Sequence, residues 1–472
     1  MNLQHGSEGT FHSAGLCGRA PTKITKHSDM KLLSATAIML SAIISLAAAG
    51  CNSTTENTVS DEELGNVYQQ LKTIYEDDLS HRVIQPAEGY LKYPYLIPSG
   101  YYKQMWDWDG FFMGNYFCSK GKPEYLRYWA LNLIEGIDEN GYVSGCATTK
   151  GPRPIFGDFS MKPFLSQGVL LASQASGDFS WIEPYYDKLC LALEYRERTQ
   201  QDEATGLFFW QIAMQSGADN NVALNYFKED KRSFLACDAS ALQMREYKAQ
   251  ALIAGKLGRE EDSRKYMKKA EELKERIMEY LWCEEDGIFY NVDRETGKHY
   301  RRVSYSCFVP LIDEIASQEQ ASSMIRRYLL DPACMKSGYG FRSLSAKDPD
   351  YNNKNMINPY SNWQGPVWPV ANYIYSIGLH RYGFDNELRW LGLTLGKLMI
   401  EDYGKYGSLH ESYDAETGAP LAPADTYVDE DGRFIGFVSW NLCVENILSG
   451  VVNDDWMTLE LSEGEAFSGT SM

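Results

Sequence analysis

Apolar residues recur along this chain at the three- and four-residue spacing of amphipathic helices. Alternating Val, Ile and Thr residues, which would predict half-buried strands, are scarce. The sequence therefore predicts a mostly helical fold and argues against a β-sandwich or a doubly wound sheet. The predicted helices cover residues 60–78, 122–137, 163–176, 181–198, 238–257, 260–281, 317–330, 367–382 and 386–400.

A five-residue pattern, D-x-x-T-G, occurs three times, at 202–206, 293–297 and 414–418. The Asp side chain can accept backbone hydrogen bonds within such a turn, and the final Gly can adopt a positive φ. Aromatic residues flank the second copy, which favours a short hairpin there. Similar hairpins and loops gathered at one end of paired helices would form a toroid with its site on one rim. The alternative is chance recurrence of common turn residues.

The N-terminal region has the layout of an export signal. Lys31 precedes an apolar run that ends in the small residues 46–50, directly before Cys51. This ending resembles the lipobox of bacterial lipoproteins, and the resemblance implies a lipidated Cys51 and an enzyme anchored in the cell envelope, on its periplasmic or cell-surface face. The run is short and Ala-rich, which suits signal removal better than the alternative of an uncleaved membrane helix.

These features divide the chain into an upstream extension (1–29), a lipoprotein signal peptide (30–50), a tether (51–60), one large domain (61–452) and an acidic C-terminal tail (453–472). No Pro/Ser-rich or low-complexity linker interrupts the chain after the tether. The lipid anchor is the one membrane contact that we expect.

The charge of the chain bears on its partners. The formal net charge of −19 becomes −21 without the first fifty residues, because these carry four basic and two acidic side chains. An acidic chain with no basic block repels phosphate backbones, so we expect no nucleic-acid partner and a neutral or cationic small substrate.

The pattern of His and Cys residues predicts no metal site. The four His residues after residue 50 are widely scattered, and the ten Cys residues form no C-x-x-C pair. We expect neither a metal ion nor an organic cofactor. The Cys residues after Cys51 are interpreted as small buried apolar side chains, although disulfides stay possible in an exported protein.

The segment WDWDGFF, at 106–112, is the strongest candidate for ligand contact. Indole faces stack on apolar C–H surfaces while neighbouring carboxylates take hydrogen bonds, and sugars offer both an apolar face and a rim of hydroxyls. The alternative is an aromatic core segment whose Asp residues cap a helix that begins near Gly110.

Four ordered blocks carry a family resemblance: WDWDGFF at 106–112, SGADNN at 216–221, NWQGPVWPVANY at 362–373 and LHESYDAETG at 409–418. Together they resemble the catalytic domain of glycoside hydrolase family 63, in particular its compact bacterial members similar to mannosylglycerate hydrolase. Trehalases of family 37 are more distant. The resemblance covers residues 62–450. It implies an all-α (α/α)6 barrel, with short hairpins and loops at one rim, and an inverting mechanism.

Inverting hydrolysis of a glycosidic bond requires a general acid and a general base separated by about 6.5–9.5 Å. The resemblance implies that Asp219 is the acid and Glu411 the base. Ala218 and Asn221 depart from the family pattern, which more often has Leu and a small hydroxyl residue there. We expect burial to raise the pKa of the acid and a hydrogen-bond network to keep the base ionised. The alternatives are an ordinary polar turn for Asp219 and a surface carboxylate for Glu411.

The remaining candidates would hold the sugar. The two Asp residues of WDWDGFF are too close in sequence to bracket a glycosidic bond, so this segment is interpreted as a wall rooted in the barrel by Phe111 and Phe112. Structural packing is the alternative for one of the two Trp residues in the third block. The predicted substrate-binding residues are Trp106, Trp108, Asp109, Trp363, Gln364, Trp368 and Tyr413.

The sequence therefore predicts an enzyme, an inverting α-glycosidase that acts on a small glycoside or an oligosaccharide end. A trehalase-like hydrolase is the first alternative. A non-catalytic glycan-binding lipoprotein is the second, and it would not need both carboxylates in one cavity. The sugar, the linkage, the leaving group and the oligomeric state do not follow from the sequence.

Overall fold

The computed structural model describes residues 59–99, 102–224, 233–356, 361–422 and 428–456. These residues belong to a unit that spans Asn57–Met472. The predicted upstream extension, the signal peptide and Cys51 lie outside the described residues, as does most of the predicted acidic tail.

Helices make up most of the described secondary structure. The α-helices are α1 (Asp61–Ile74), α2 (Ser80–Arg82), α3 (Asp107–Ser119), α4 (Glu124–Glu135), α5 (Leu165–Ser176), α6 (Tyr186–Gln200), α7 (Cys237–Lys256), α8 (Glu260–Tyr280), α9 (Gln318–Met324), α10 (Pro369–Arg381), α11 (Asp385–Tyr406) and α12 (Cys443–Asn453). The 3-10 segments are η2 (Ser180–Tyr185), η3 (Ala213–Ser216), η4 (Val222–Leu224), η5 (Tyr305–Asp313) and η7 (Ser439–Leu442), and the π-helical turns are η1 (Tyr75–Leu79) and η6 (Ile325–Leu329).

The strands are two or three residues long and form small antiparallel sheets. They are β1 (Ile84–Gln85), β2 (Tyr95–Leu96), β3 (Met105–Trp106), β4 (Cys146–Thr148), β5 (Gly151–Pro152), β6 (Phe209–Trp210), β7 (Phe234–Leu235), β8 (Trp282–Cys283), β9 (Ile288–Phe289), β10 (Val292–Asp293), β11 (Ser412–Tyr413) and β12 (Pro420–Ala422). The sheets pair β1 with β2, β8 with β9, and β11 with β12, and join β3-β4-β5 and β10-β7-β6.

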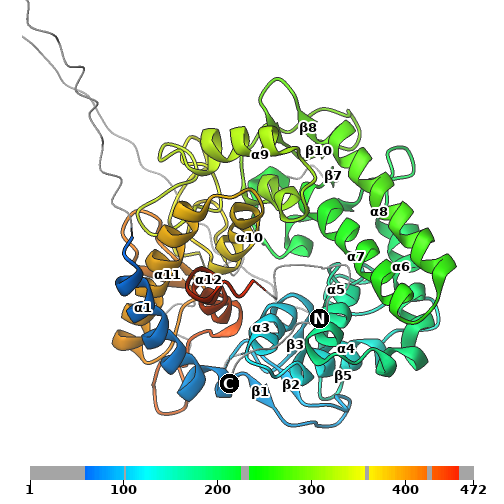
Figure 1. Cartoon of the computed structure of the whole chain (residues 1–472), viewed down its shortest axis with the longest axis horizontal. Coiled ribbons are helices and arrows are strands. Elements are labelled where there is room, and N and C mark those ends of the chain that lie inside the picture. The colour runs from blue at the N-terminus through cyan, green and yellow to red at the C-terminus, as the bar shows by residue number, and fades with distance from the viewer. Residues whose placement is uncertain (1–58, 100–101, 225–232, 357–360, 423–427, 457–472) are drawn as a thin grey trace, which may run out of the picture. The chain divides into compact units, whose positions relative to one another are not determined.

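The helical elements form two concentric layers (Figure 1). The inner ring runs α3, α5, α7, η5, α10 and α12, each packed on the next, and α12 closes the ring against α3. Outer helices cover it: α4 packs on α3 and α5, α8 on α7, and α1 and α11 on α12. The predicted (α/α)6 barrel is confirmed, with η5 supplying one inner position as a 3-10 helix.

The outer helices α1 and α8 match the periodicity of the sequence, because each buries one stripe. In α8 the buried residues are Tyr266, Ala270, Leu273 and Ile277, spaced three and four apart.

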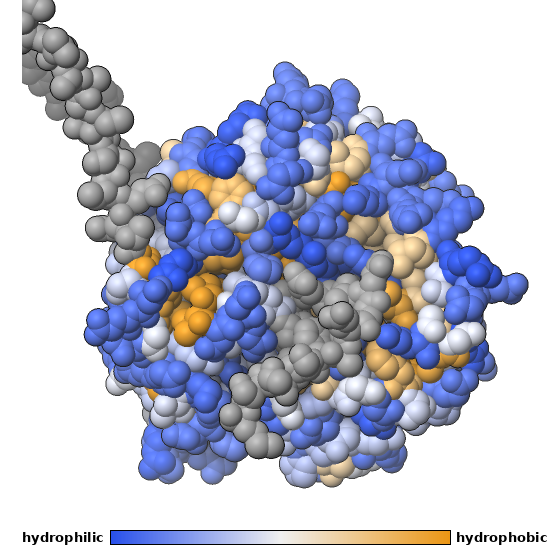
Figure 2. Space-filling view, viewed as in Figure 1, coloured by the Kyte–Doolittle hydropathy of each residue, from blue (hydrophilic) through white to orange (hydrophobic). Residues whose placement is uncertain are grey.

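Hydrophilic residues dominate the periphery of the face shown in Figure 2. Within the described ranges, no helix combines the length and apolar content needed to cross a bilayer.

The apolar periodicity did not predict two inner helices, α3 and α12, although the alternative interpretation of WDWDGFF placed the start of a helix near Gly110. All residues of α3 from Asp107 to Cys118 are buried, so the helix has no polar face to produce a period. The interpretation of WDWDGFF as a rooted wall takes the segment as a loop. In the structure the segment begins a helix instead. The Asp107 side chain accepts a 2.6 Å hydrogen bond from the N–H of Trp108 in the first turn.

The three D-x-x-T-G turns share one geometry, as predicted. In each copy the Gly N–H donates to the Asp carbonyl at 2.8 Å, and the Asp side chain accepts from the Thr N–H at 2.9–3.0 Å. The three Gly residues have φ of 66–75°. Each turn joins a short antiparallel pair, 201 with 208, 292 with 299, and 413 with 420.

One buried indole fixes the spacing of α3, α4 and α5. Trp129 of α4 packs where Gly110 and Gly168 leave room, since an added Cβ would lie 2.1 Å and 2.4 Å from its ring atoms. Its Nε1–H also donates to the carbonyl of Trp106 at 3.1 Å. The position of the WDWDGFF segment therefore depends on this contact.

We expect Gly168→Ala to lower the free energy of unfolding by about 1–3 kcal/mol, because the new methyl group overpacks against Trp129. The matched control is Gly404→Ala in α11, where an added Cβ meets nothing within 4 Å. That change should raise the free energy by up to about 1 kcal/mol. Urea unfolding followed by circular dichroism measures both, and equal stability of the two variants would contradict the packing argument.

Candidate active site

The first three blocks of the sequence meet in space. The ring of Trp108 lies against Gly217, where an added Cβ would be 3.2 Å from the indole. Asn220 accepts a hydrogen bond from the backbone N–H of Trp363 at 2.5 Å. Segments from α3, from the turn after η3 and from the approach to α10 therefore form one continuous surface.

The third and fourth blocks are joined by a short backbone ladder. Val367 and Tyr413 exchange N–H···O=C hydrogen bonds of 2.8 and 3.0 Å. Val367 precedes the start of α10 at Pro369, and Glu411 precedes β11. The ladder therefore brings the segment that carries Glu411 to the rim where the other blocks meet.

Asp219 has the electrostatic character of a proton donor. Its Oδ2 accepts a 2.6 Å hydrogen bond from the Ser361 hydroxyl. The side chain keeps partial solvent exposure, yet burial among protein atoms raises the pKa of Asp219 to about 6, against the opposing effects of Ser361 and the Lys162 charge. Asp219 therefore holds its proton at a higher pH than an ordinary Asp, which suits a general acid.

Glu411 is 5% exposed. Burial raises the pKa of Glu411 to about 8, and the negative charges of Asp109 and Asp219 add to the increase. The Tyr102 hydroxyl donates to its Oε1 at 3.4 Å. This differs from the expectation that a hydrogen-bond network keeps the base ionised, because a single long hydrogen bond is too weak to offset burial.

Asp109 lies in the first turn of α3 and accepts a 2.7 Å hydrogen bond from the Ser439 hydroxyl. Burial raises the pKa of Asp109 to about 7, against the effects of Ser439 and Lys162. The Asp107 carboxylate has a different partner and accepts a 2.8 Å hydrogen bond from the backbone N–H of Lys162. The two carboxylates of the segment have different partners, because residues two apart on a helix point to different sides.

Asp109, Asp219 and Glu411 form one electrostatic cluster, since the charges of the first two act on the third. Burial raises the pKa of each of the three carboxyls, so each keeps its proton to a higher pH than an ordinary carboxyl does. Such a cluster can supply one proton and accept another. That is the capacity which acid–base chemistry at a glycosidic bond requires.

Trp106 and Trp108 occupy different environments. Trp108 is 4% exposed and packs edge-to-face on Phe112 and Trp440, with ring centroids 5.3 and 6.4 Å apart. Trp106 is partly exposed and contacts the ring of Tyr102. Its Nε1–H has no hydrogen-bond partner in the described part of the chain, so it is a free donor beside the residue that contacts Glu411.

Trp363 and Trp368 stack face to face, with centroids 4.4 Å apart and ring planes 9° apart. Each is 1% exposed. The Trp368 Nε1–H donates to the carbonyl of Asn362 at 2.8 Å, whereas the Trp363 Nε1–H has no partner among the described residues. The pair is a packed wall, and direct contact of either indole with a sugar stays a prediction.

Gln364 and Tyr413 differ in solvent exposure. Gln364 is partly exposed, and its Oε1 accepts a 2.8 Å hydrogen bond from Asn352. Tyr413 is fully buried, and its hydroxyl donates to Asp402 at 2.7 Å. The geometry therefore favours a bracing role behind Glu411 for Tyr413, in place of the sugar contact expected from the sequence.

Lys162 is a site residue that the sequence reasoning missed. Its ammonium lies 3.4 Å from the Asp107 carboxylate and 5.9 Å from the centre of the Trp108 ring. Its charge lowers the pKa of both Asp109 and Asp219. A lone Lys before a predicted helix carries no local signal of this role, because its partners come from other segments.

The segment 437–441, FVSWN, was also missed. Ser439, which holds Asp109, has a φ of +24°, a conformation that non-glycine residues rarely adopt. Trp440 packs between Trp108 and Trp368, at 6.4 and 6.1 Å, and its Nε1–H has no partner within the described ranges. The signal available was an uncharged stretch with two aromatic residues beside polar ones.

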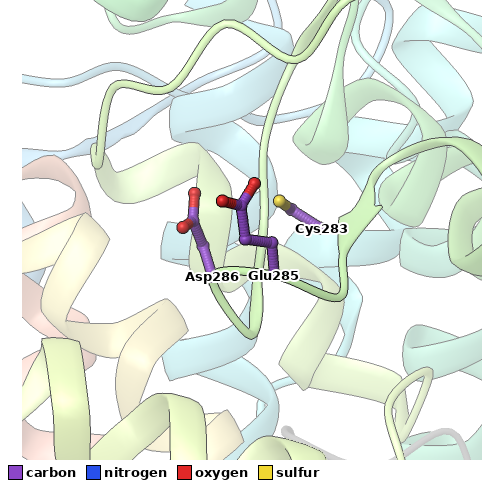
Figure 3. A group of neighbouring side chains, drawn as sticks. All are labelled: Cys283, Glu285 and Asp286. Atoms are coloured by element: carbon purple, nitrogen blue, oxygen red, sulfur yellow. The ribbon is translucent and has the colours of Figure 1, made fainter.

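One group of side chains has metal-ligand spacing in the described residues: Cys283, Glu285 and Asp286, in the turn between β8 and β9 (Figure 3). Arg301 already places its guanidinium among them. It forms an ion pair with Glu285, lies 3.4 Å from Asp286 and contacts the Cys283 sulfur at 3.8 Å. The arginine supplies the positive charge there, and the group shares no residue with the carboxyl cluster.

The raised pKa of Glu411 predicts a pH-dependent penalty on stability. An unfolded Glu ionises near about pH 4.3, whereas the folded protein keeps this proton up to about pH 8. Between these values the folded state binds more protons than the unfolded state, so the free energy of unfolding falls as pH rises. The penalty is absent below the unfolded pKa and complete above the folded one.

We therefore expect Glu411→Gln to melt at a higher temperature than the wild type at about pH 8.5 and at a similar temperature at about pH 4.5. The control is Glu416→Gln, whose carboxylate is exposed and paired with Arg342 at 2.7 Å, and which should gain nothing at pH 8.5. Scanning calorimetry at both pH values measures this. A Glu411→Gln protein that is less stable at the higher pH would contradict it.

The chain is similar to known glycoside hydrolases over most of its length. Residues 101–428 match the mannosylglycerate hydrolase MGH1-like glycoside hydrolase domain. The chain is 31% identical over 172 residues to a cytosolic neutral trehalase of Kluyveromyces lactis, a match covering 36% of this chain and 22% of that protein. It is 26% identical over 168 residues to a mannosylglycerate hydrolase of Rubrobacter radiotolerans, covering 36% of each. These matches span well under two thirds of either relative.

The fold is similar to the crystal structure of the family 63 mannosylglycerate hydrolase from Thermus thermophilus in complex with glucose, with a TM-score of 0.61 and 15% identity over 81% of this chain and 99% of that one. At this identity the likeness shows the fold alone. The family match covers more than half of the sequence and includes both Asp219 and Glu411. The chain therefore belongs to the mannosylglycerate hydrolase MGH1-like family of glycoside hydrolase domains.

Proposed function

We propose that this protein is an inverting α-glycosidase, with Asp219 as general acid and Glu411 as general base. The observation that carries the proposal is the interaction between these two carboxyls. They come from different blocks, yet the charge on Asp219 raises the pKa of Glu411. A glycan-binding protein without catalysis has no need to bury both carboxyls together against their mutual repulsion.

In this mechanism Asp219 protonates the glycosidic oxygen as the bond to the anomeric carbon breaks. Glu411 removes a proton from a water molecule that attacks the same carbon from the opposite face, so the anomeric configuration inverts. The reactive form has Asp219 protonated and Glu411 ionised, and it is a minority form because the pKa of Asp219 is about 6 and that of Glu411 about 8. The hydrogen bond from Ser361, 2.6 Å long, stabilises the carboxylate that Asp219 becomes. Asp109 accepts hydrogen bonds from sugar hydroxyls, and Trp106, Trp108, Gln364 and Trp368 form the walls around the ring.

The names of the relatives narrow the substrates to test. Trehalose and mannosylglycerate, which they imply, are both small α-linked glycosides, and an acid–base pair can cleave the glycosidic bond of either. Trehalase-like activity stays the first alternative. The carboxyl cluster does not distinguish the two, because both substrates need the same acid–base chemistry and differ in the groups that the sugar contacts must recognise.

We expect Asp219→Asn and Glu411→Gln each to lower kcat by about 100–10,000-fold, because each removes one proton transfer. The exposed Asp431→Asn should keep full activity. The assay is release of reducing sugar from trehalose, mannosylglycerate, glucosylglycerate and aryl α-glycosides. Glycosyl-glycerates and aryl α-glycosides should give the β-anomer as first product when followed by NMR. Trehalose should give α- and β-glucose in equal amounts, because the leaving glucose keeps its configuration.

The outcomes separate the alternatives. An α-anomer as first product from a glycosyl-glycerate or an aryl glycoside would exclude inversion. Activity retained in folded Asp219→Asn or Glu411→Gln would exclude the assignment of that residue. Sugar binding without hydrolysis of any compound in the panel would favour the non-catalytic glycan-binding protein. Cleavage of trehalose alone would favour the trehalase-like alternative.

We further propose, on the lipobox-like ending of the sequence, that Cys51 is lipidated and holds the enzyme in the cell envelope, on the periplasmic or cell-surface face. Cys51→Ser should abolish incorporation of labelled palmitate in a bacterial host and move the protein from the membrane fraction to the soluble one. Cys17→Ser, in the expected upstream extension, is the matched control and should change neither. Membrane retention of the Cys51→Ser protein would contradict the anchor.

A further inference from the structure

The carboxyl of Glu411 depends on its backbone for position. Among the described residues its side chain is held by the long Tyr102 hydrogen bond of 3.4 Å. A base must lie within about 2.6–3.2 Å of the water that it activates, so a displaced loop costs rate. The residues on either side of Glu411 therefore control where its carboxylate points.

Both flanks of Glu411 converge on one buried carboxylate, Asp402. It lies in α11 and is 5% exposed. It accepts hydrogen bonds from the backbone N–H of His410 at 3.0 Å and from the Tyr413 hydroxyl at 2.7 Å. The His410 ring nitrogen Nδ1 lies 3.0 Å from both carboxylate oxygens. Three donors from the loop are thus held by a single side chain of a long helix.

The surroundings of His410 make this arrangement rigid. Its ring stacks on Phe434 at 4.5 Å, with ring planes 19° apart, and meets the edge of Tyr406 at 5.0 Å. Its carbonyl accepts a 2.8 Å hydrogen bond from Asn441, whose own carbonyl accepts one of 2.9 Å from Tyr75. The network runs from η1 through the segment 437–441 to the loop of Glu411.

We propose that Asp402 is a positioning residue that sets the carboxylate of Glu411 in line with the attacking water. The proposal rests on the proposed role of Glu411 as base. A carboxylate accepts from all three donors, whereas an Asn at this position has one oxygen and would turn an NH2 group toward donors. Loss of Asp402 frees the loop of Glu411 while the sugar-holding walls in α3 and residues 362–368 stay in place.

This role predicts a specific kinetic effect. Asp402→Asn should lower kcat by about 10–100-fold through misplacement of the base, while KM changes by less than about twofold because sugar contacts are kept. Tyr413→Phe removes one of the three donors and keeps the ring, so it should lower kcat in the same direction by less. The Tyr413→Phe variant also tests the proposal if Asp402→Asn fails to fold. The matched control is Tyr403→Phe in the same helix, which removes a 2.9 Å hydrogen bond to Asp78 and should leave kcat unchanged.

A second background separates positioning from general structural damage. In Glu411→Ala, azide can attack the anomeric carbon without a base, while Asp219 protonates the departing oxygen and a β-glycosyl azide forms. Because Asp402 acts through Glu411, adding Asp402→Asn or Tyr413→Phe to Glu411→Ala should change the azide reaction by less than about twofold.

The proposal would be overturned if Asp402→Asn or Tyr413→Phe lowered the rate equally in the enzyme that keeps Glu411 and in Glu411→Ala with azide. An unchanged kcat in a folded Asp402→Asn or Tyr413→Phe enzyme would also overturn it. Failure of the proposed function is distinguishable from either result. If Glu411→Ala keeps wild-type hydrolysis, Glu411 is not the base. If Glu411→Ala loses hydrolysis and Asp402→Asn and Tyr413→Phe do not, Glu411 stays the base and the positioning role of Asp402 is wrong.

Discussion

The burial of three interacting carboxyls is the constraint on which the rest of this structure depends. Asp109, Asp219 and Glu411 are surrounded by protein, and burial is the largest cause of the raised pKa of each. Their hydrogen-bond donors are neutral hydroxyls, not guanidinium or ammonium groups. An arginine beside each carboxylate would lower the pKa and stabilise the fold, but it would also remove the ability to exchange protons near neutral pH.

The barrel keeps these groups in place through contacts that are mostly remote in sequence. The inner ring of helices is packed without a polar face in α3, and the indole of Trp129 locks α3 to its neighbours. Strain is also concentrated here, since Ser439 adopts a positive φ while its hydroxyl holds Asp109. Rigid packing around α3 on one side of the carboxyls and a braced loop on the other are what allow carboxyls with few partners to remain aligned.

Local patterns predicted the outer helices, the three D-x-x-T-G hairpins and the barrel, because each depends on residues that are neighbours in sequence or on ordered blocks of a family. The periodicity missed the inner helix α3, since a helix buried on all sides can lose the apolar period, and it also missed α12. Asp219 and Glu411 were named from their blocks, whereas Lys162, Ser439 and Asp402 were not. Their roles arise from partners that only the folded chain brings together, such as the contact of Asp402 with both flanks of Glu411.

The separation of the two proposed catalytic carboxyls across a bound substrate tests the central claim most directly. A crystal structure of the wild-type enzyme with a thio-linked, uncleaved analogue of its glycoside would measure it. The inverting mechanism predicts that the Asp219 and Glu411 carboxyls lie about 6.5–9.5 Å apart, on opposite faces of the anomeric carbon, with a water molecule between Glu411 and that carbon. A separation near about 5 Å, or carboxyls on the same face of the sugar, would contradict the account.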